Sequence, residues 1–111
     1  MNTQVTERDG VVIISLSGKI MGGPEAGQIN DQINNLIDAG KIRIIIDLKQ
    51  VEWMNSSGLG ILIGAITTLR NNGGKMILAN VSERIENLLK ITKLISVFEI
   101  EKDVDKAITA F

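Results

Sequence analysis

The 111-residue chain contains neither histidine nor cysteine. It can therefore form no Ser-His-Asp triad, no cysteine nucleophile, no disulfide and almost none of the usual zinc or iron–sulfur sites. The sequence has 12 basic and 13 acidic residues, so its formal net charge is −1 and no overall field attracts nucleic acid or an anionic membrane. The composition thus disfavours self-contained catalysis, a resident metal or cofactor, and nucleic-acid binding.

Long apolar runs and aromatic side chains are also scarce. No run of 18 apolar residues is present, and no charged and then apolar leader precedes a cleavage site, so we expect a cytoplasmic protein without membrane contact. Aromatic residues make up 3 % of the chain, whereas hydrophobic residues make up 44 % and include 19 isoleucines, which favour buried strands. Length and composition predict one α/β domain over residues 1–111.

The apolar periodicity predicts about five strands and about four helices. Strands are expected at 3–7, 11–17, 42–48, 76–79 and 97–100, with Gly18 closing the second strand and residues 50–55 forming a connection. Helices are expected from Pro24 to Gly40, over 59–69, after a Ser82 cap, and over 104–111.

The order of these elements predicts a mostly parallel, mixed sheet. Strands that alternate with helices form right-handed crossovers between parallel neighbours. The consecutive apolar residues Ile44 to Ile46 suit a central strand covered on both faces. Asp9-Gly10 is a tight hairpin turn, so the N-terminal strand is expected to be an antiparallel edge strand.

The segment 53–60, Trp-Met-Asn-Ser-Ser-Gly-Leu-Gly, joins a buried strand to an apolar helix. Such loops lie at the carboxyl ends of strands, where ligands and partners usually bind. Asn55 or Ser56 can simply cap the helix. The two serines can also be a phosphorylation site, part of an anion pocket or, least favoured without a histidine, a nucleophile. Neither G-x-S-x-G nor a P-loop motif is present.

Other polar features have simpler explanations. Gly73-Gly74 suits a helix cap and turn. Asp47 and Glu52 are neither spaced nor accompanied by further ligand residues as a metal site would require. The basic residues Arg84, Lys90 and Lys93 suit a solvated helix face or, alternatively, a partner contact. Trp53 and Met54 can be either core residues or exposed interaction residues.

Residues 47–60 resemble the signature of bacterial anti-sigma factor antagonists, which are single STAS domains, named for sulphate transporters and anti-sigma antagonists. The resemblance extends to residues 16–20, 72–75, 78–82 and 94–98, and so covers nearly the whole chain. It implies a regulatory protein that is not an enzyme. Its partner would be an anti-sigma factor that is also a serine kinase of the GHKL type, and binding would free the sigma factor.

The resemblance also implies a phosphorylation switch. Its acceptor would be the first serine of the motif, Ser56, with Ser57 as the less favoured choice, and a PP2C-type phosphatase would reset it. We expect the partner-binding surface to comprise Met21, Gly22, Met54, Asn55, Ser56, Ser57, Gly58 and Leu59. A phosphate adds about −1.5 to −2 charge, enough to weaken a complementary interface.

The sequence departs from the family at two positions near this surface. Asn55 and Met21 stand where an acidic residue is common, so two negative charges are missing. STAS domains also serve without phosphorylation as scaffold subunits of stress-signalling or lipid-transport complexes. That role is the alternative function for this chain.

Overall fold

The computed structural model describes residues 1–111 and contains one five-stranded sheet with the order β1-β2-β3-β4-β5. Its strands are β1 (Asn2–Arg8), β2 (Val11–Ile20), β3 (Arg43–Met54), β4 (Lys75–Ala79) and β5 (Glu99–Glu101). Its α-helices are α1 (Pro24–Asp38), α2 (Ser56–Asn71), α3 (Glu83–Ile91) and α4 (Val104–Ile108). β1 is antiparallel to β2 and all other neighbours are parallel, which confirms the predicted mixed sheet.

Local sequence explains where most elements begin and end. Asp9 and Gly10 both have positive φ, of 55° and 77°, as the two-residue hairpin turn requires. Gly40, which follows α1, and Gly73, which follows α2, also have positive φ and end these helices. The Ser82 side chain accepts the Ile85 N–H at 3.2 Å and caps α3. These predicted turns and caps are confirmed.

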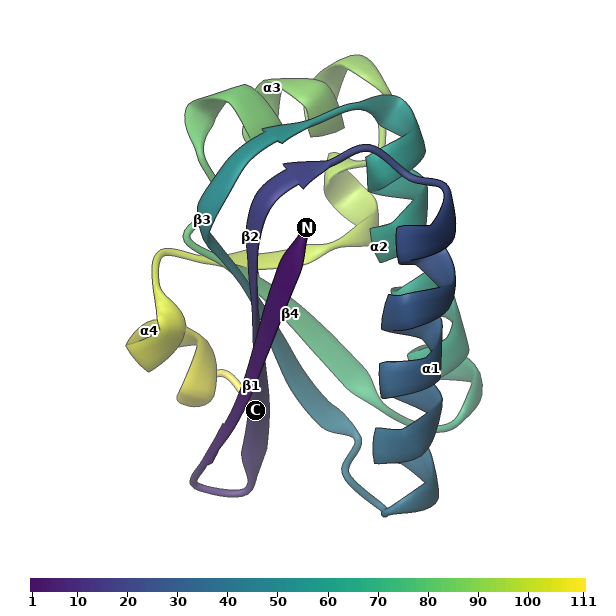
Figure 1. Cartoon of the computed structure of the whole chain (residues 1–111). Helices are drawn as coiled ribbons and strands as arrows, with labels where there is room; N and C mark the ends of the chain where they lie inside the picture. The colour runs from purple at the N-terminus through teal and green to yellow at the C-terminus, as the bar shows by residue number, and fades with distance from the viewer.

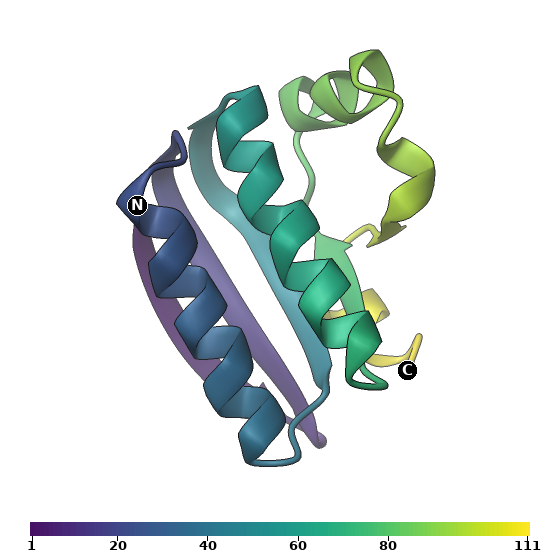
Figure 2. The same cartoon turned by 90° about the vertical axis from the view of Figure 1, so that its right-hand side faces the viewer.

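The helices form an uneven cover over the sheet. Helices α1 and α2 run side by side along one face (Figure 2), whereas the short α4 lies on the other face and α3 lies beyond the ends of β2 and β3 (Figure 1). Side chains along β2, β3 and β4 alternate between the two faces of the sheet. One set points toward α1 and α2, where 21 buried residues form the main core. The sheet therefore holds the N-terminal end of α2 close to the carboxyl ends of β2 and β3.

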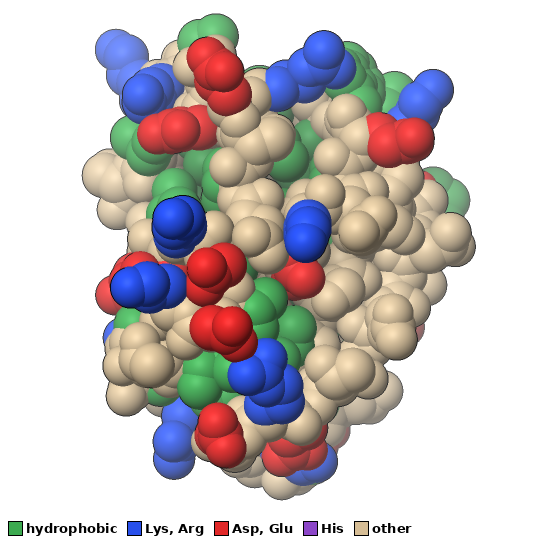
Figure 3. Space-filling view, turned by 90° about the vertical axis from the view of Figure 1, so that its left-hand side faces the viewer, with side chains coloured by type: hydrophobic (Ala, Val, Ile, Leu, Met, Phe, Trp, Pro, Cys, Tyr) green, Lys and Arg blue, Asp and Glu red, His purple; other side chains and the backbone are tan.

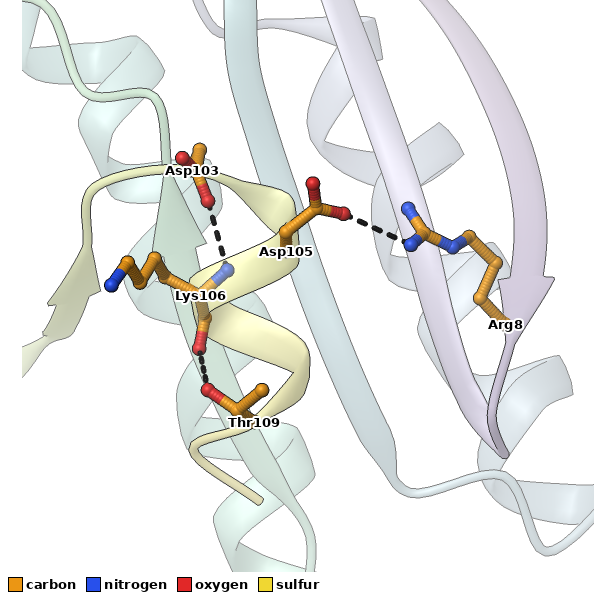
Figure 4. A network of polar contacts seen from close by, with 5 residues as sticks. All are labelled: Arg8, Asp103, Asp105, Lys106 and Thr109. Atoms are coloured by element: carbon orange, nitrogen blue, oxygen red, sulfur yellow. Dashed lines mark hydrogen bonds and ion pairs between the residues drawn. The ribbon is translucent and has the colours of Figure 1, made fainter.

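A smaller core lies between the sheet and α4. Six buried residues form it: Val11, Ile13, Ile45, Ile77, Ala79 and Ala107. The Asp103 side chain caps α4 by accepting the Lys106 N–H at 2.8 Å, and Asp105 pairs with Arg8 of β1 at 2.9 Å (Figure 4). Around the exposed apolar atoms of this face, acidic and basic side chains are interspersed (Figure 3), so no large area of one sign forms there.

Two strands extend by three or more residues past their predicted ends. The sequence suggested that Gly18 ends β2 and that residues 50–55 form a loop, but β2 continues to Ile20 and β3 to Met54. Both predictions were wrong because the two strands keep pairing past bulges, with shifts between Ser15 and Ser17 and between Gly18 and Lys19. A bulge breaks the strict alternation of apolar residues, so the extension has no simple signature in the sequence.

The C-terminal elements also differ in extent. A 3₁₀ turn (Ile95–Val97) occupies the start of the predicted last strand, and β5 begins only at Glu99. Helix α4 ends at Ile108 rather than at Phe111. Val104, Ala107, Ile108 and Phe111 still pack on one side against the sheet, as their spacing predicted.

Candidate functional site

The predicted site residues come together where β2 and β3 end and α2 begins. Ile20 pairs with Met54, and the Asn55 N–H donates to the Ile20 carbonyl oxygen at 3.3 Å. Met21 and Gly22 follow β2, while Asn55 and the first turn of α2 follow β3, so the loop after β2 lies next to the N-terminal end of α2. This place is the carboxyl edge of the sheet, as the sequence indicated.

Asn55 is the N-cap of α2. Its backbone is extended, with φ −101° and ψ −179°, and its Oδ1 accepts the Gly58 N–H at 2.7 Å. The Asn55 carbonyl oxygen accepts the Leu59 N–H at 2.9 Å, which is the first turn of the helix. Of the two candidate caps in the sequence, Asn55 and Ser56, Asn55 is the cap, and Ser56 and Ser57 occupy the first two helical positions.

Glycine allows the end of β2 and its following loop to approach the start of α2 this closely. A Cβ on Gly58 would overlap the carbonyl oxygen of Ile20, so α2 begins directly on the end of β2. A Cβ on Gly22 would lie 2.9 Å from the Ser57 Cβ, and Gly22 has a φ of 91°, which disfavours other residues. Ser57 is therefore packed against the Gly22 backbone.

The predicted contact residues differ in exposure. Ser56 and Ser57 are exposed, Met21 is 45 % exposed, and Gly22 and Asn55 are half-buried. Met54, Gly58 and Leu59 are buried, with only 4 % of Met54 and 1 % of Leu59 accessible. The exposed members can touch a partner with their side chains, and the buried members shape the loop that presents them.

The start of α2 carries no negative charge of its own. No acidic residue lies in the first turn, and residues 53–60 are all uncharged. The first N–H groups of a helix lack intrahelical partners and carry a partial positive charge. A phosphate on the Ser56 hydroxyl would therefore be the only negative charge within residues 53–60.

Two open hollows that both border Trp53 contain residues that the sequence did not mark as a group. The first, of about 600 Å³, is lined by Trp53, Met54, Asn55, Glu83, Arg84, Asn87, Leu88 and Ile91. The second, of about 510 Å³, is lined by Lys19, Met21, Glu52, Trp53 and Arg84. Trp53 and Arg84 were each weighed as interaction residues, but Ile91 was missed. Its signal is an apolar side chain outside the buried stripe of Ile85 and Leu89.

Asp47 has a structural environment rather than a metal-binding one. Its carboxylate accepts Asn80 Nδ2 at 2.8 Å, the Lys49 N–H at 3.1 Å and Ser15 Oγ at 3.4 Å. No group of three or more aspartate, glutamate, histidine or cysteine side chains gathers in the chain. No helix combines the length and the apolar character needed to cross a membrane.

Comparisons with known proteins agree with this architecture. Residues 2–107 match the family model described as STAS domain. An anti-sigma F factor antagonist of Paenibacillus polymyxa is 28 % identical over 112 residues, which cover 98 % of this chain and 95 % of the relative. The crystal structure of an anti-sigma factor antagonist from Mycobacterium paratuberculosis has a TM-score of 0.82 at 28 % identity and covers 98 % of this chain and 92 % of its own.

A further solved structure is that of the Bacillus cell fate determinant SpoIIAA in its phosphorylated form. It has a TM-score of 0.73 at 24 % identity, and the alignment covers 98 % of both chains. At this level of identity, the likeness shows that the two chains share a fold. Because the family model spans residues 2–107, nearly the whole sequence, the chain belongs to the STAS domain family.

Proposed function

We propose that the chain is an anti-sigma factor antagonist whose binding is switched by phosphorylation of Ser56. With Ser56 unmodified, it binds an anti-sigma factor that is also a GHKL-type serine kinase, and the sigma factor is released in the cytoplasm. A relative from Paenibacillus polymyxa that matches over almost its full length is named an anti-sigma F factor antagonist, which supports this role.

The exposed position of Ser56 at the start of α2 carries the proposal. Its hydroxyl is open to a kinase, and the adjacent N–H groups of the helix stabilise a phosphate. The uncharged segment 53–60 means that phosphorylation changes the local charge from zero to about −2. The family resemblance also points to this serine, and the solved SpoIIAA structure is of a phosphorylated protein.

Packing favours Ser56 over Ser57 as the acceptor. The Cβ and backbone of Ser57 lie next to Gly22, which places the loop that follows β2 beside a phosphate on Ser57. In the proposed reaction the Ser56 oxygen attacks the γ-phosphorus of ATP, ADP leaves, and the hydroxyl proton passes to a base of the kinase. The chain itself is the substrate and needs no cofactor. A PP2C-type phosphatase would hydrolyse the phosphoserine and restore binding.

The test is incubation with ATP and each purified GHKL-type anti-sigma factor of the source organism, followed by intact-mass measurement. We expect one added phosphate on the wild type and on Ser57→Ala, and none on Ser56→Ala. A PP2C-type phosphatase should remove it. Modification of Ser56→Ala to the same extent would contradict the assignment. Binding of a partner without modification by any kinase would instead favour the scaffold role.

The same proposal holds that the chain is not an enzyme. The sequence contains no histidine that could act as a base for the Ser56 hydroxyl. Activated esters should therefore be hydrolysed no faster by the wild type than by Ser56→Ala. A Ser56-dependent turnover would contradict this part of the proposal.

A further inference from the structure

Three of the four large hydrophobic side chains that the fold leaves exposed line the two hollows described above. Met21 is 45 % exposed, Trp53 36 % and Ile91 79 %; Trp53 lines both hollows, Met21 the smaller one and Ile91 the larger one. Only Val5 on the edge strand lies elsewhere. Apolar side chains gathered on one exposed surface are typical of an interaction site.

Helix α3 presents a second face to this surface. Arg84, Asn87, Leu88 and Ile91 follow the i, i+3, i+4, i+7 spacing of one helix face, and all line the larger hollow. Ile85 and Leu89 of the same helix are fully buried in the main core. The core therefore holds α3 in place without Ile91, whose side chain is 79 % exposed.

The charged side chains that line this surface form no ion pair within the chain. Arg84 is the one charged residue that lines both hollows; Glu83 also lines the larger one, and Lys19 and Glu52 line the smaller one. None of them belongs to any of the five ion pairs of the structure. An arginine beside a tryptophan is a frequent pair at the energetic centre of protein interfaces. The guanidinium group of arginine donates hydrogen bonds in a planar fork, and this geometry matches the two oxygens of a carboxylate.

The surface is continuous with the proposed switch. Asn55, the cap of α2 directly before Ser56, lines the larger hollow together with Arg84. In both ribbon views α3 lies beside the N-terminal end of α2 (Figures 1 and 2). A partner seated against Trp53 would thus be close to a phosphate on Ser56.

We infer that the anti-sigma factor docks an apolar side chain flanked by a carboxylate between Met21, Trp53 and Ile91, with the carboxylate on Arg84. This inference rests on the proposed function and names the chemistry of its partner surface. It also gives phosphorylation a direct effect, since a phosphate on Ser56 repels the incoming carboxylate. The partner's carboxylate would thus both contribute to binding and be the group that the phosphate repels.

The test measures the dissociation constant for the purified anti-sigma factor by calorimetry. Trp53→Ala should weaken binding about 30-fold, and Arg84→Gln and Ile91→Ser about tenfold each, as for central interface residues. Val5→Ser and Lys106→Gln are the matched controls, since they remove an exposed apolar side chain and an exposed charge elsewhere; both should bind as the wild type does. Ile91→Ser changes a side chain that is 79 % exposed, so folding does not depend on it.

Trp53 is the only tryptophan of the chain, so its emission reports directly on this surface. Addition of the anti-sigma factor to the wild type should shift the emission to shorter wavelength as water is excluded. If Ser56→Asp weakens binding while Arg84→Gln and Ile91→Ser do not, the docking inference is overturned and the proposed switch stands. An emission shift that depends only on the concentration of the chain itself would assign the surface to a second copy, and no binding by any anti-sigma factor would overturn both proposals.

Discussion

At the scale of single residues, the junction between β3 and α2 depends on two side chains and one missing side chain. Asn55 caps the helix through its side chain, Ser56 is exposed beside it, and Gly58 lets the helix begin on the Ile20 carbonyl group. The family pattern places an acidic residue at position 55, but an amide oxygen caps a helix as well as a carboxylate does. The substitution therefore keeps the geometry and removes a charge.

Loss of the Asn55 cap should lower stability. We expect Asn55→Ala to reduce the free energy of unfolding by about 1 kcal/mol, because the Gly58 N–H loses its acceptor. Urea denaturation followed by circular dichroism measures the change. Asn34→Ala in the exposed part of α1 is the control and should not destabilise the chain. Equal midpoints for Asn55→Ala and the wild type would show that the cap contributes nothing.

Gly58 should be far less replaceable than the other glycines of α2. Gly58→Ala places a methyl group onto the Ile20 carbonyl, so we expect a loss of about 3 kcal/mol or an unfolded protein. Gly60→Ala and Gly64→Ala meet nothing within 4 Å and should each stabilise the helix by roughly 0.5 to 1 kcal/mol. Thermal melting of the three variants gives the comparison, and the same melting temperature for Gly58→Ala and Gly60→Ala would contradict it.

At the scale of elements, the sequence predicts type and order better than length. Every predicted strand and helix exists, because apolar periodicity and turn residues are local properties. The extension of β3 to Met54 depends instead on Gln50, Val51 and Trp53 finding partners on β2. That extension also moves Trp53 out of a loop and onto a strand, where it borders both hollows.

Helix α4 should be held by its apolar contacts and not by its ion pair. The Arg8 and Asp105 side chains are 53 % and 80 % exposed, so Asp105→Asn should change the free energy of unfolding by no more than about 0.5 kcal/mol. Ala107 is fully buried against the sheet, and Ala107→Asp should cost about 3 kcal/mol or more. Urea titrations of both variants measure the difference; a larger loss for Asp105→Asn than for Ala107→Asp would reverse this assignment.

At the scale of the whole molecule, the small net charge gives one phosphate a large relative weight. A formal charge of −1 and a phosphate of about −2 sum to about −3. No other feature of the fold has to change, because the N-terminal end of α2 stabilises an anion. The switch that we propose is therefore a change of surface charge on a fixed structure.

The folded state should survive that change of charge. We expect Ser56→Asp to unfold with a free energy equal to that of the wild type or higher by up to about 1 kcal/mol, because a carboxylate at the N-terminal end complements the helix dipole. Asn71→Asp at the other end of α2 is the matched control and should lose stability by a similar amount. Chemical denaturation measures both, and marked destabilisation by Ser56→Asp would indicate a switch that works by unfolding.

The sequence alone determined the class of fold, the absence of histidine and cysteine chemistry, and the strand-to-helix segment that carries Ser56, because composition, periodicity and capping are local. Only the tertiary structure decided that Gly22 packs against Ser57 and that α3 brings Arg84 and Ile91 beside Trp53. These residues are far apart in the chain, and their meeting depends on bulged strand pairing and on how α3 packs against the core. Such contacts arise from the burial of apolar surface by the chain as a whole, which no short segment encodes.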